Sequence, residues 1–218
     1  MSLRLKVCGM AQPDNLRTVA ALAPDFLGFI FYPKSRRFAG ATLQPADASA
    51  LPAGIQKVGV FVDEEPAVIQ ARVQEYGLNL VQLHGAETPE TCAALQAVGI
   101  PVSKAFAVGE TFDFSVLEAY VGNVTYFLFD TAGTQPGGNG IPFNWQLLEQ
   151  YHLPVPYFLA GGLALEHAAE LRNLSLPGLF ALDLNSRFET EPGVKDAGRL
   201  GQLFHEIRTL GVSTSIPS

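Results

Sequence analysis

Short apolar runs alternate with amphipathic stretches along nearly the whole chain. The runs have the length and the β-branched and aromatic content of buried strands, and the stretches between them place apolar residues at helical spacing. The expected strands are residues 3–7, 26–31, 56–62, 80–83, 101–105, 126–130, 157–160 and 179–182. The expected helices are residues 13–23, 44–51, 66–76, 89–98, 112–120, 144–150, 164–173 and 195–209.

Regular alternation of strands and helices predicts a parallel sheet, because each helix carries the chain back to the start of the next strand. Eight such repeats within 218 residues favour a closed (β/α)8 barrel, the TIM-barrel fold of the α/β class, formed by one domain over residues 1–210. An open doubly wound sheet is the alternative, although the usual dinucleotide-binding motif is missing after the first strand. Residues 211–218 are expected to form a disordered tail.

The charge balance narrows the classes of partner. With 21 acidic and 14 basic residues, the chain carries a net charge of -7, which argues against nucleic-acid and membrane-surface partners. No apolar run is long enough to span a membrane, and the first residues lack a signal-peptide pattern. The two cysteines, Cys8 and Cys92, have no metal-ligand spacing, which indicates a reducing, cytoplasmic compartment and no metal site.

Alternation of side chains along the strands places several polar groups at one rim of the expected barrel. Active sites of such barrels lie at the C-terminal ends of the strands, where inward-pointing side chains face the ligand. Cys8, Gln82, His84 and Asp130 fall inward at strand ends by this count, and Lys6 lies one layer below Cys8. Taken alone, Cys8 is better explained as a small buried hydrophobic residue. Three strands that each deliver a polar group to the same rim indicate a site.

The ends of the seventh and eighth strands are expected to bind an anion. Gly161 and Gly162 lie between a strand and a helix, where backbone N–H groups and the helix N-terminus favour phosphate, and barrels often hold phosphate at this place. A tight turn without a ligand is the alternative for this glycine pair. Asp183 and Asn185 share a face after the eighth strand, where they could hydrogen-bond a sugar or support the phosphate loop.

Two other loops carry candidate binding elements. Lys34, Arg36 and Arg37 follow the second strand, and a guanidinium group there could hold a substrate carboxylate through paired hydrogen bonds. A solvated run of charge is the alternative. The long loop after Asp130, residues 131–140, contains four glycines and is typical of a lid or binding loop, the alternative being slack in a solvent loop.

Seven motifs together resemble phosphoribosylanthranilate isomerase, an enzyme family of tryptophan biosynthesis. They occur in the family's order between residue 3 and about residue 204, and jointly they are highly specific, although several are weak singly. The motifs are KVCGM at 6–10, GFIFYPKSRR at 28–37, VGVFV at 58–62, VQLHGAE at 81–87, FD at 129–130 with GGNG at 137–140, AGGL at 160–163, and the stretch from Asp183 to GVKD at 193–196.

The resemblance implies an Amadori rearrangement of the phosphosugar N-(5-phosphoribosyl)anthranilate without cofactor or metal. Asp130 would be the general acid that opens the ribose ring, and Cys8 the general base that removes the proton from C2. These roles predict a lowered thiol pKa and a raised carboxyl pKa. Arg37 would hold the anthranilate carboxylate, with Gln82, His84 and Asp183 as further substrate-binding residues suggested by their position.

For the phosphate, the resemblance implies binding by Gly161, Gly162, Asn185 and Ser186. Arg187 stands where the family commonly has glycine, and arginine adopts a positive φ less readily. Either this loop is rebuilt, or Arg187 adds a phosphate contact. Two other functions remain as alternatives: another phosphosugar barrel enzyme, such as a metal-dependent epimerase or an indole-forming synthase, and a non-catalytic phosphate-binding or thiol-redox module.

Overall fold

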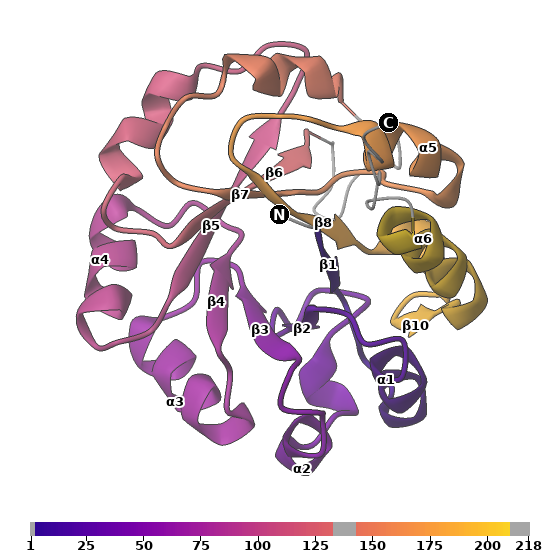
Figure 1. The fold of residues 1–218 in the computed structure, drawn as a ribbon. Coiled ribbons are helices and arrows are strands. Elements are labelled where there is room, and N and C mark those ends of the chain that lie inside the picture. The colour runs from indigo at the N-terminus through magenta and orange to yellow at the C-terminus, as the bar shows by residue number, and fades with distance from the viewer. Residues whose placement is uncertain (1–2, 133–142, 210–218) are drawn as a thin grey trace, which may run out of the picture.

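Eight parallel strands form one closed barrel in a computed structural model that describes residues 3–132 and 143–209 (Figure 1). Each strand pairs with its neighbours in the sequence, and β1 pairs with β8, with Arg4 opposite Ala181 and Val7 opposite Leu184. The predicted fold class is therefore confirmed. The strands are β1 (Arg4–Val7), β2 (Phe26–Ile30), β3 (Gln56–Phe61), β4 (Leu80–Leu83), β5 (Val102–Val108), β6 (Tyr126–Thr131), β7 (Tyr157–Leu159) and β8 (Leu179–Leu184).

Helices surround the barrel on its outside (Figure 1). The α-helices are α1 (Pro13–Ala20), α2 (Pro45–Ser49), α3 (Pro66–Tyr76), α4 (Pro89–Ala97), α5 (Ala168–Asn173) and α6 (Ala197–Thr209). The first four of these begin at a proline, whose fixed φ suits the first helical position and whose missing N–H costs no hydrogen bond there. Within the described residues, no helix has the length and apolar character needed to cross a membrane.

Several connections contain 3₁₀-helices, which are tighter than α-helices, and some of them lie where the sequence pattern predicts an α-helix. They are η1 (Ala39–Ala41), η2 (Phe114–Tyr120), η3 (Trp145–Gln150), η4 (Leu165–His167) and η5 (Ser186–Phe188). The side chains of Asp113 and Asn144 each accept a hydrogen bond from the backbone N–H two residues later, which starts η2 and η3 as tight turns. The expected helices at 112–120 and 144–150 were therefore wrong in type, and the one at 164–173 begins with η4.

Two apolar layers lie on opposite sides of the strands. Phe127 and Phe129 belong to the outer layer between the strands and the helices. Leu128, Phe26 and Phe158 belong to the smaller layer inside the barrel, where the rings of Phe26 and Phe158 meet edge to face. The alternation predicted for β6 is confirmed, and it leaves the next inward position, Asp130, at the open end of the barrel.

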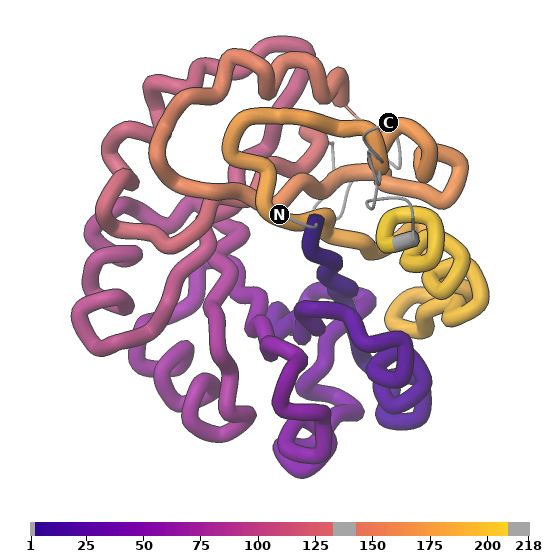
Figure 2. The backbone as a smooth tube through the Cα atoms, in the orientation of Figure 1, coloured from indigo at the N-terminus to yellow at the C-terminus, as the bar shows by residue number. Residues whose placement is uncertain are grey.

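A two-stranded antiparallel hairpin, β9 (Glu189–Glu191) and β10 (Val194–Lys195), lies between β8 and α6. The sequence pattern did not predict it. The backbone trace in Figure 2 shows this part of the chain lying beside α1, and the Asn15 side chain on α1 hydrogen-bonds the backbone of Lys195 on β10, so residues far apart in sequence meet here. The expected tail at 211–218, and residues 133–140 of the expected lid, lie outside the described residues.

Candidate active site

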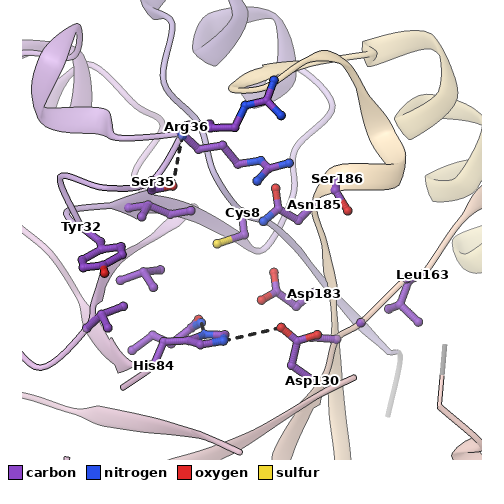
Figure 3. A pocket seen from close by; sticks show the side chains of 18 of the residues that line it. Cys8, Tyr32, Ser35, Arg36, His84, Asp130, Leu163, Asp183, Asn185 and Ser186 are labelled. Carbon is purple, nitrogen blue, oxygen red and sulfur yellow. Dashed lines mark hydrogen bonds and ion pairs between the residues drawn. The ribbon is translucent and has the colours of Figure 1, made fainter. Parts of the chain in front are cut away.

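A cavity of about 430 Å³ opens at the C-terminal ends of the strands. Its volume falls within the range of small-molecule sites. All of the site residues predicted from the sequence line it, although they come from the ends of β1, β4, β6 and β8 and from three loops. They are Cys8, Arg37, Gln82, His84, Asp130, Gly161, Gly162, Asp183, Asn185, Ser186 and Arg187. Figure 3 shows the side chains of Cys8, His84, Asp130 and Asp183 converging on the same space.

The Cys8 thiol lies at the end of β1, where only 4% of the residue is exposed. Its backbone N–H donates to Leu184 O on β8, at 2.8 Å, and Gly28 on β2 packs directly against it. Burial raises the pKa of the thiol, and the ammonium groups of Lys6 and Lys195 offset that rise only in part. The lowered thiol pKa expected from the sequence was therefore wrong, because the loss of water around the sulfur outweighs the two nearby cations.

Asp130 presents its carboxyl group from the end of β6. Burial raises its pKa to about 6, and the Asp183 carboxylate adds to the rise, whereas the Thr131 N–H and the Lys6 ammonium act against it. The Thr131 N–H donates to Asp130 Oδ1 at 2.8 Å. The expected rise in the carboxyl pKa is confirmed, so a minor fraction of this group, about one tenth, still carries a proton at pH 7.

Beneath the cavity, the buried ammonium group of Lys6 forms an ion pair with Asp183. Lys6 Nζ donates to Asp183 Oδ2 and to Gln82 Oε1, both at 2.7 Å. Burial disfavours the charged ammonium, but Asp183 and Cys8 together outweigh this effect and raise the pKa of Lys6. Asp183 Oδ1 is buried and has no hydrogen-bond partner among the described residues, although the residue lines the cavity. Buried acceptors are rarely left without a partner, so this oxygen is a candidate acceptor for a ligand in the cavity.

His84 links this buried group to Asp130. Gln82 Nε2 and His84 Nδ1 are 3.0 Å apart, and His84 Nε2 lies 3.6 Å from Asp130 Oδ2. Burial, together with the charges of Lys6 and Lys104, lowers the pKa of His84 to about 4. The imidazole is consequently neutral at physiological pH.

The phosphate-binding residues expected from the sequence lie at one side of the cavity. Gly161 and Gly162 have φ values of 85° and 67°, a conformation that strongly favours glycine, and both residues line the cavity. Arg187 does not have a positive φ, since Ser186–Phe188 form the 3₁₀ turn η5, anchored by the fully buried Phe188. The loop is therefore built differently from one that needs glycine at this position. Arg187 also lines the cavity.

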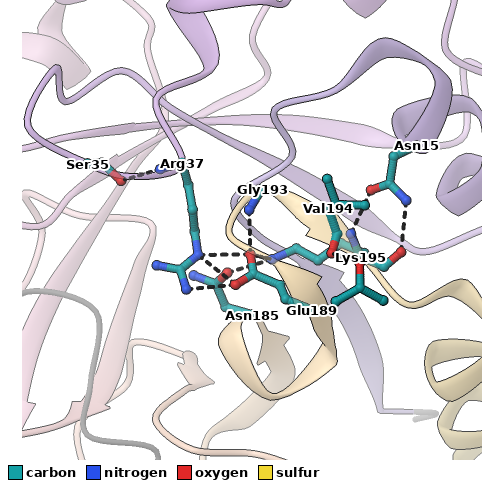
Figure 4. A network of polar contacts seen from close by, with 9 residues as sticks. Asn15, Ser35, Arg37, Asn185, Glu189, Gly193, Val194 and Lys195 are labelled. Carbon is teal, nitrogen blue, oxygen red and sulfur yellow. Dashed lines mark hydrogen bonds and ion pairs between the residues drawn. The ribbon is translucent and has the colours of Figure 1, made fainter.

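Arg37 is held by a carboxylate that sequence reasoning did not assign to the site. Glu189 on β9 accepts from Arg37 Nε at 2.8 and 3.0 Å and from Nη2 at 2.7 Å (Figure 4). The buried Lys195 on β10 donates to Glu189 Oε1 and to Asn185 Oδ1, both at 2.6 Å. Although burial acts in the opposite direction, Arg37 and Lys195 hold the pKa of Glu189 below its usual value.

This cluster of Arg37, Glu189, Lys195 and Asn185 carries two positive charges and one negative charge beside the cavity. Arg37 and Glu189 lie 152 residues apart in sequence, so only the closed barrel brings them together. The one sequence signal for Lys195 was the GVKD motif, which did not reveal its contacts. Among the residues that the structure describes, no group of three or more His, Cys, Asp or Glu side chains could hold a metal ion.

Comparisons with known proteins show which family the chain is similar to and agree with its barrel fold. A family profile described as N-(5'phosphoribosyl)anthranilate (PRA) isomerase matches residues 5–206. The N-(5'-phosphoribosyl)anthranilate isomerase of Parabacteroides distasonis is 41% identical over 213 residues, covering 96% of each chain. The crystal structure of phosphoribosyl anthranilate isomerase from Thermotoga maritima superposes with a TM-score of 0.80 at 32% identity, covering 95% of this chain and 100% of that one.

A further crystal structure contains a ligand. Phosphoribosyl anthranilate isomerase in complex with reduced 1-(o-carboxyphenylamino)-1-deoxyribulose 5-phosphate has a TM-score of 0.74 and 30% identity, and the match covers 95% of this chain and 100% of that one.

Proposed function

The chain belongs to the N-(5'-phosphoribosyl)anthranilate isomerase family, and we propose that Cys8 and Asp130 are the base and the acid of its reaction. The enzyme is an isomerase that catalyses an Amadori rearrangement in tryptophan biosynthesis. N-(5-phosphoribosyl)anthranilate becomes 1-(2-carboxyphenylamino)-1-deoxyribulose 5-phosphate. The net change moves hydrogen within one molecule, so the protein has to deliver one proton and remove another.

One observation carries the assignment of these two groups. Cys8 at the end of β1 and Asp130 at the end of β6 face one cavity from different sides of the barrel, and the Asp130 carboxyl has a pKa of about 6 (Figure 3). Asp130 protonates the ring oxygen of the ribose, and the C1–O bond breaks to give an open-chain Schiff base. Cys8 then takes the proton from C2. The resulting enolamine tautomerises to the ketone.

The protonation states of the two groups are coupled. Between pH 6 and the raised pKa of Cys8, the two groups together hold one proton, which resides mostly on sulfur in the free enzyme. The reactive arrangement has that proton on Asp130 and a thiolate at Cys8. The ammonium groups of Lys6 and Lys195 favour this thiolate. A minor but reactive form of the pair is compatible with efficient acid–base catalysis.

The rest of the cavity supplies binding groups for the three parts of the substrate. Arg37 is oriented by Glu189 and keeps N–H donors for the anthranilate carboxylate. The backbone at Gly161 and Gly162, together with Asn185, Ser186 and Arg187, binds the phosphate. Asp183 Oδ1, for which residues 3–132 and 143–209 provide no partner, accepts a hydrogen bond from a sugar hydroxyl. Gln82 and His84 form the wall between the sugar and the barrel interior.

Separate substitution of the two reacting groups tests the assignment. We expect Cys8→Ala and Asp130→Asn each to lower kcat by about 10² to 10⁴, the usual contribution of a general acid or base. Both variants should keep the native unfolding temperature and should still bind a product analogue. Cys92→Ala is the matched control, since Cys92 is a buried thiol in α4 that does not line the cavity. Ordinary turnover in either active-site variant would refute the roles. Normal Cys8 thiol reactivity without turnover in the native enzyme would favour a non-catalytic module.

A further inference from the structure

A chain of hydrogen bonds leads from Lys6 to the imidazole of His84, and its direction is fixed by chemistry. The Lys6 ammonium group can only donate, so the Gln82 side-chain atom that it meets at 2.7 Å must be the oxygen, Oε1. The amide nitrogen of Gln82 therefore points the other way, to His84 Nδ1 at 3.0 Å. An amide nitrogen also only donates, so Nδ1 has to be the acceptor in this contact.

We propose that Lys6 and Gln82 lock His84 in the tautomer with its proton on Nε2, so that His84 acts as a positioning residue that donates to the Asp130 carboxylate. A neutral imidazole that accepts at Nδ1 must carry its hydrogen on Nε2. That nitrogen lies 3.6 Å from Asp130 Oδ2. This separation is longer than a hydrogen bond, and contacts of this kind tighten when a substrate closes the site.

The groups around His84 and Asp130 support this arrangement. Lys6 from β1 and Lys104 from β5 face His84, and both disfavour an imidazolium. Asp183 from β8 and Lys6 face Asp130 with opposite charges, and β5 brings only Ala107 opposite it in register. Lys104 is itself paired with the buried Glu87, at 3.2 Å. The imidazole of His84 is consequently neutral, and its hydrogen bond with Gln82 sets its orientation.

The Nε2–H group of His84 acts when Asp130 gives up its proton and becomes a carboxylate. With Thr131 N–H at Oδ1 and His84 Nε2–H at Oδ2, both oxygens of the resulting carboxylate have a donor. A donor that meets the ionised form makes the acid stronger and fixes its direction towards the cavity. This role rests on the proposed function of Asp130, whereas the tautomer itself does not.

Nitrogen-15 NMR of histidine-labelled enzyme tests the tautomer without any turnover. The chain has four histidines, and loss of one signal set in His84→Gln identifies His84. In the native enzyme we expect a neutral ring with Nδ1 unprotonated from pH 5 to pH 8. In Gln82→Glu the new carboxylate can only accept, so the proton should move to Nδ1. Gln202→Leu, an exposed glutamine on α6, is the control and should leave the His84 signals unchanged.

Turnover tests the positioning role through a matched pair of variants. The amide nitrogen of glutamine can take the place of Nε2, so His84→Gln should keep kcat within a few-fold of native, whereas His84→Leu should lower kcat about tenfold to a hundredfold. His84→Leu should also move the acidic limb of the pH profile of kcat/KM upwards, because the Asp130 carboxylate loses a donor.

Three results would overturn the inference: a native His84 protonated on Nδ1, an unchanged tautomer in folded Gln82→Glu, or equal losses of kcat in His84→Gln and His84→Leu. Failure of the proposed function would look different. In that case Asp130→Asn would keep its turnover, while the NMR result for His84 could still stand.

Discussion

Replacing Gly28 with alanine should displace the Cys8 thiol without removing any polar group from the site. Gly28 lies on β2, beside the end of β1. A Cβ built at this position would lie 2.7 Å from Cys8 Sγ and 3.0 Å from Cys8 Cα. Rotation of the thiol relieves only the first of these contacts, since the second involves the backbone. The methyl group therefore has to push the end of β1 away.

The size of the effect follows from these distances. Ordinary contact begins near 3.4 Å, so the sulfur has to move by at least 0.7 Å, the difference between 3.4 and 2.7 Å. A misplacement approaching 1 Å costs about 10²-fold in rate. Overpacking of one methyl group costs about 1–3 kcal/mol in stability. For a chain of this size each kcal/mol lowers Tm by about 2–4 °C.

Steady-state kinetics and thermal unfolding of Gly28→Ala measure the two effects. We expect kcat to fall about a hundredfold in a protein that still unfolds cooperatively. Gly54→Ala is the matched control, because a Cβ at Gly54 meets no atom within 4 Å, and it should keep native kcat and Tm. A folded Gly28→Ala enzyme with kcat within twofold of native would refute the reasoning that the position of the Cys8 sulfur limits the reaction.

Two other predictions concern charge. The profile of kcat/KM against pH should fall about tenfold per unit below pH 6, because Asp130, with a pKa of about 6, and Cys8 are then both protonated and no base remains; a flat profile from pH 7 to pH 5 would contradict this protonation scheme. Glu189→Gln should raise KM about tenfold and change kcat less, because Arg37 loses its charge-assisted hydrogen bonds but touches no reacting atom. An unchanged KM would show that Arg37 keeps its position without Glu189. The control is Glu166→Gln, because Glu166 is an exposed carboxylate paired with Arg199.

The barrel and the residues at its rim follow from local patterns in the amino-acid sequence. Each strand is short and alternates regularly, so parity alone sends Leu128 inward, Phe129 outward and Asp130 to the mouth of the barrel. Local signals are enough here because side-chain direction along a strand has a period of two. Local sequence signals were weaker for the segments that connect the strands. In η2 and η3 the choice between an α-helix and a 3₁₀-helix depends on packing and on single capping hydrogen bonds.

Tertiary structure decided how the rim residues are charged and held. Arg37 is held by the carboxylate of Glu189, on a hairpin 152 positions away. A contact over this separation produces no local sequence pattern that periodicity could reveal. The sign of the Cys8 pKa shift also had to come from the fold. The sign depends on whether burial, which raises the pKa of the thiol, outweighs the neighbouring ammonium groups, which lower it. Burial dominates because the closed barrel removes water from around the sulfur. Sequence fixes the direction of a side chain along a strand, whereas burial and long-range charge arise only when the strands are assembled.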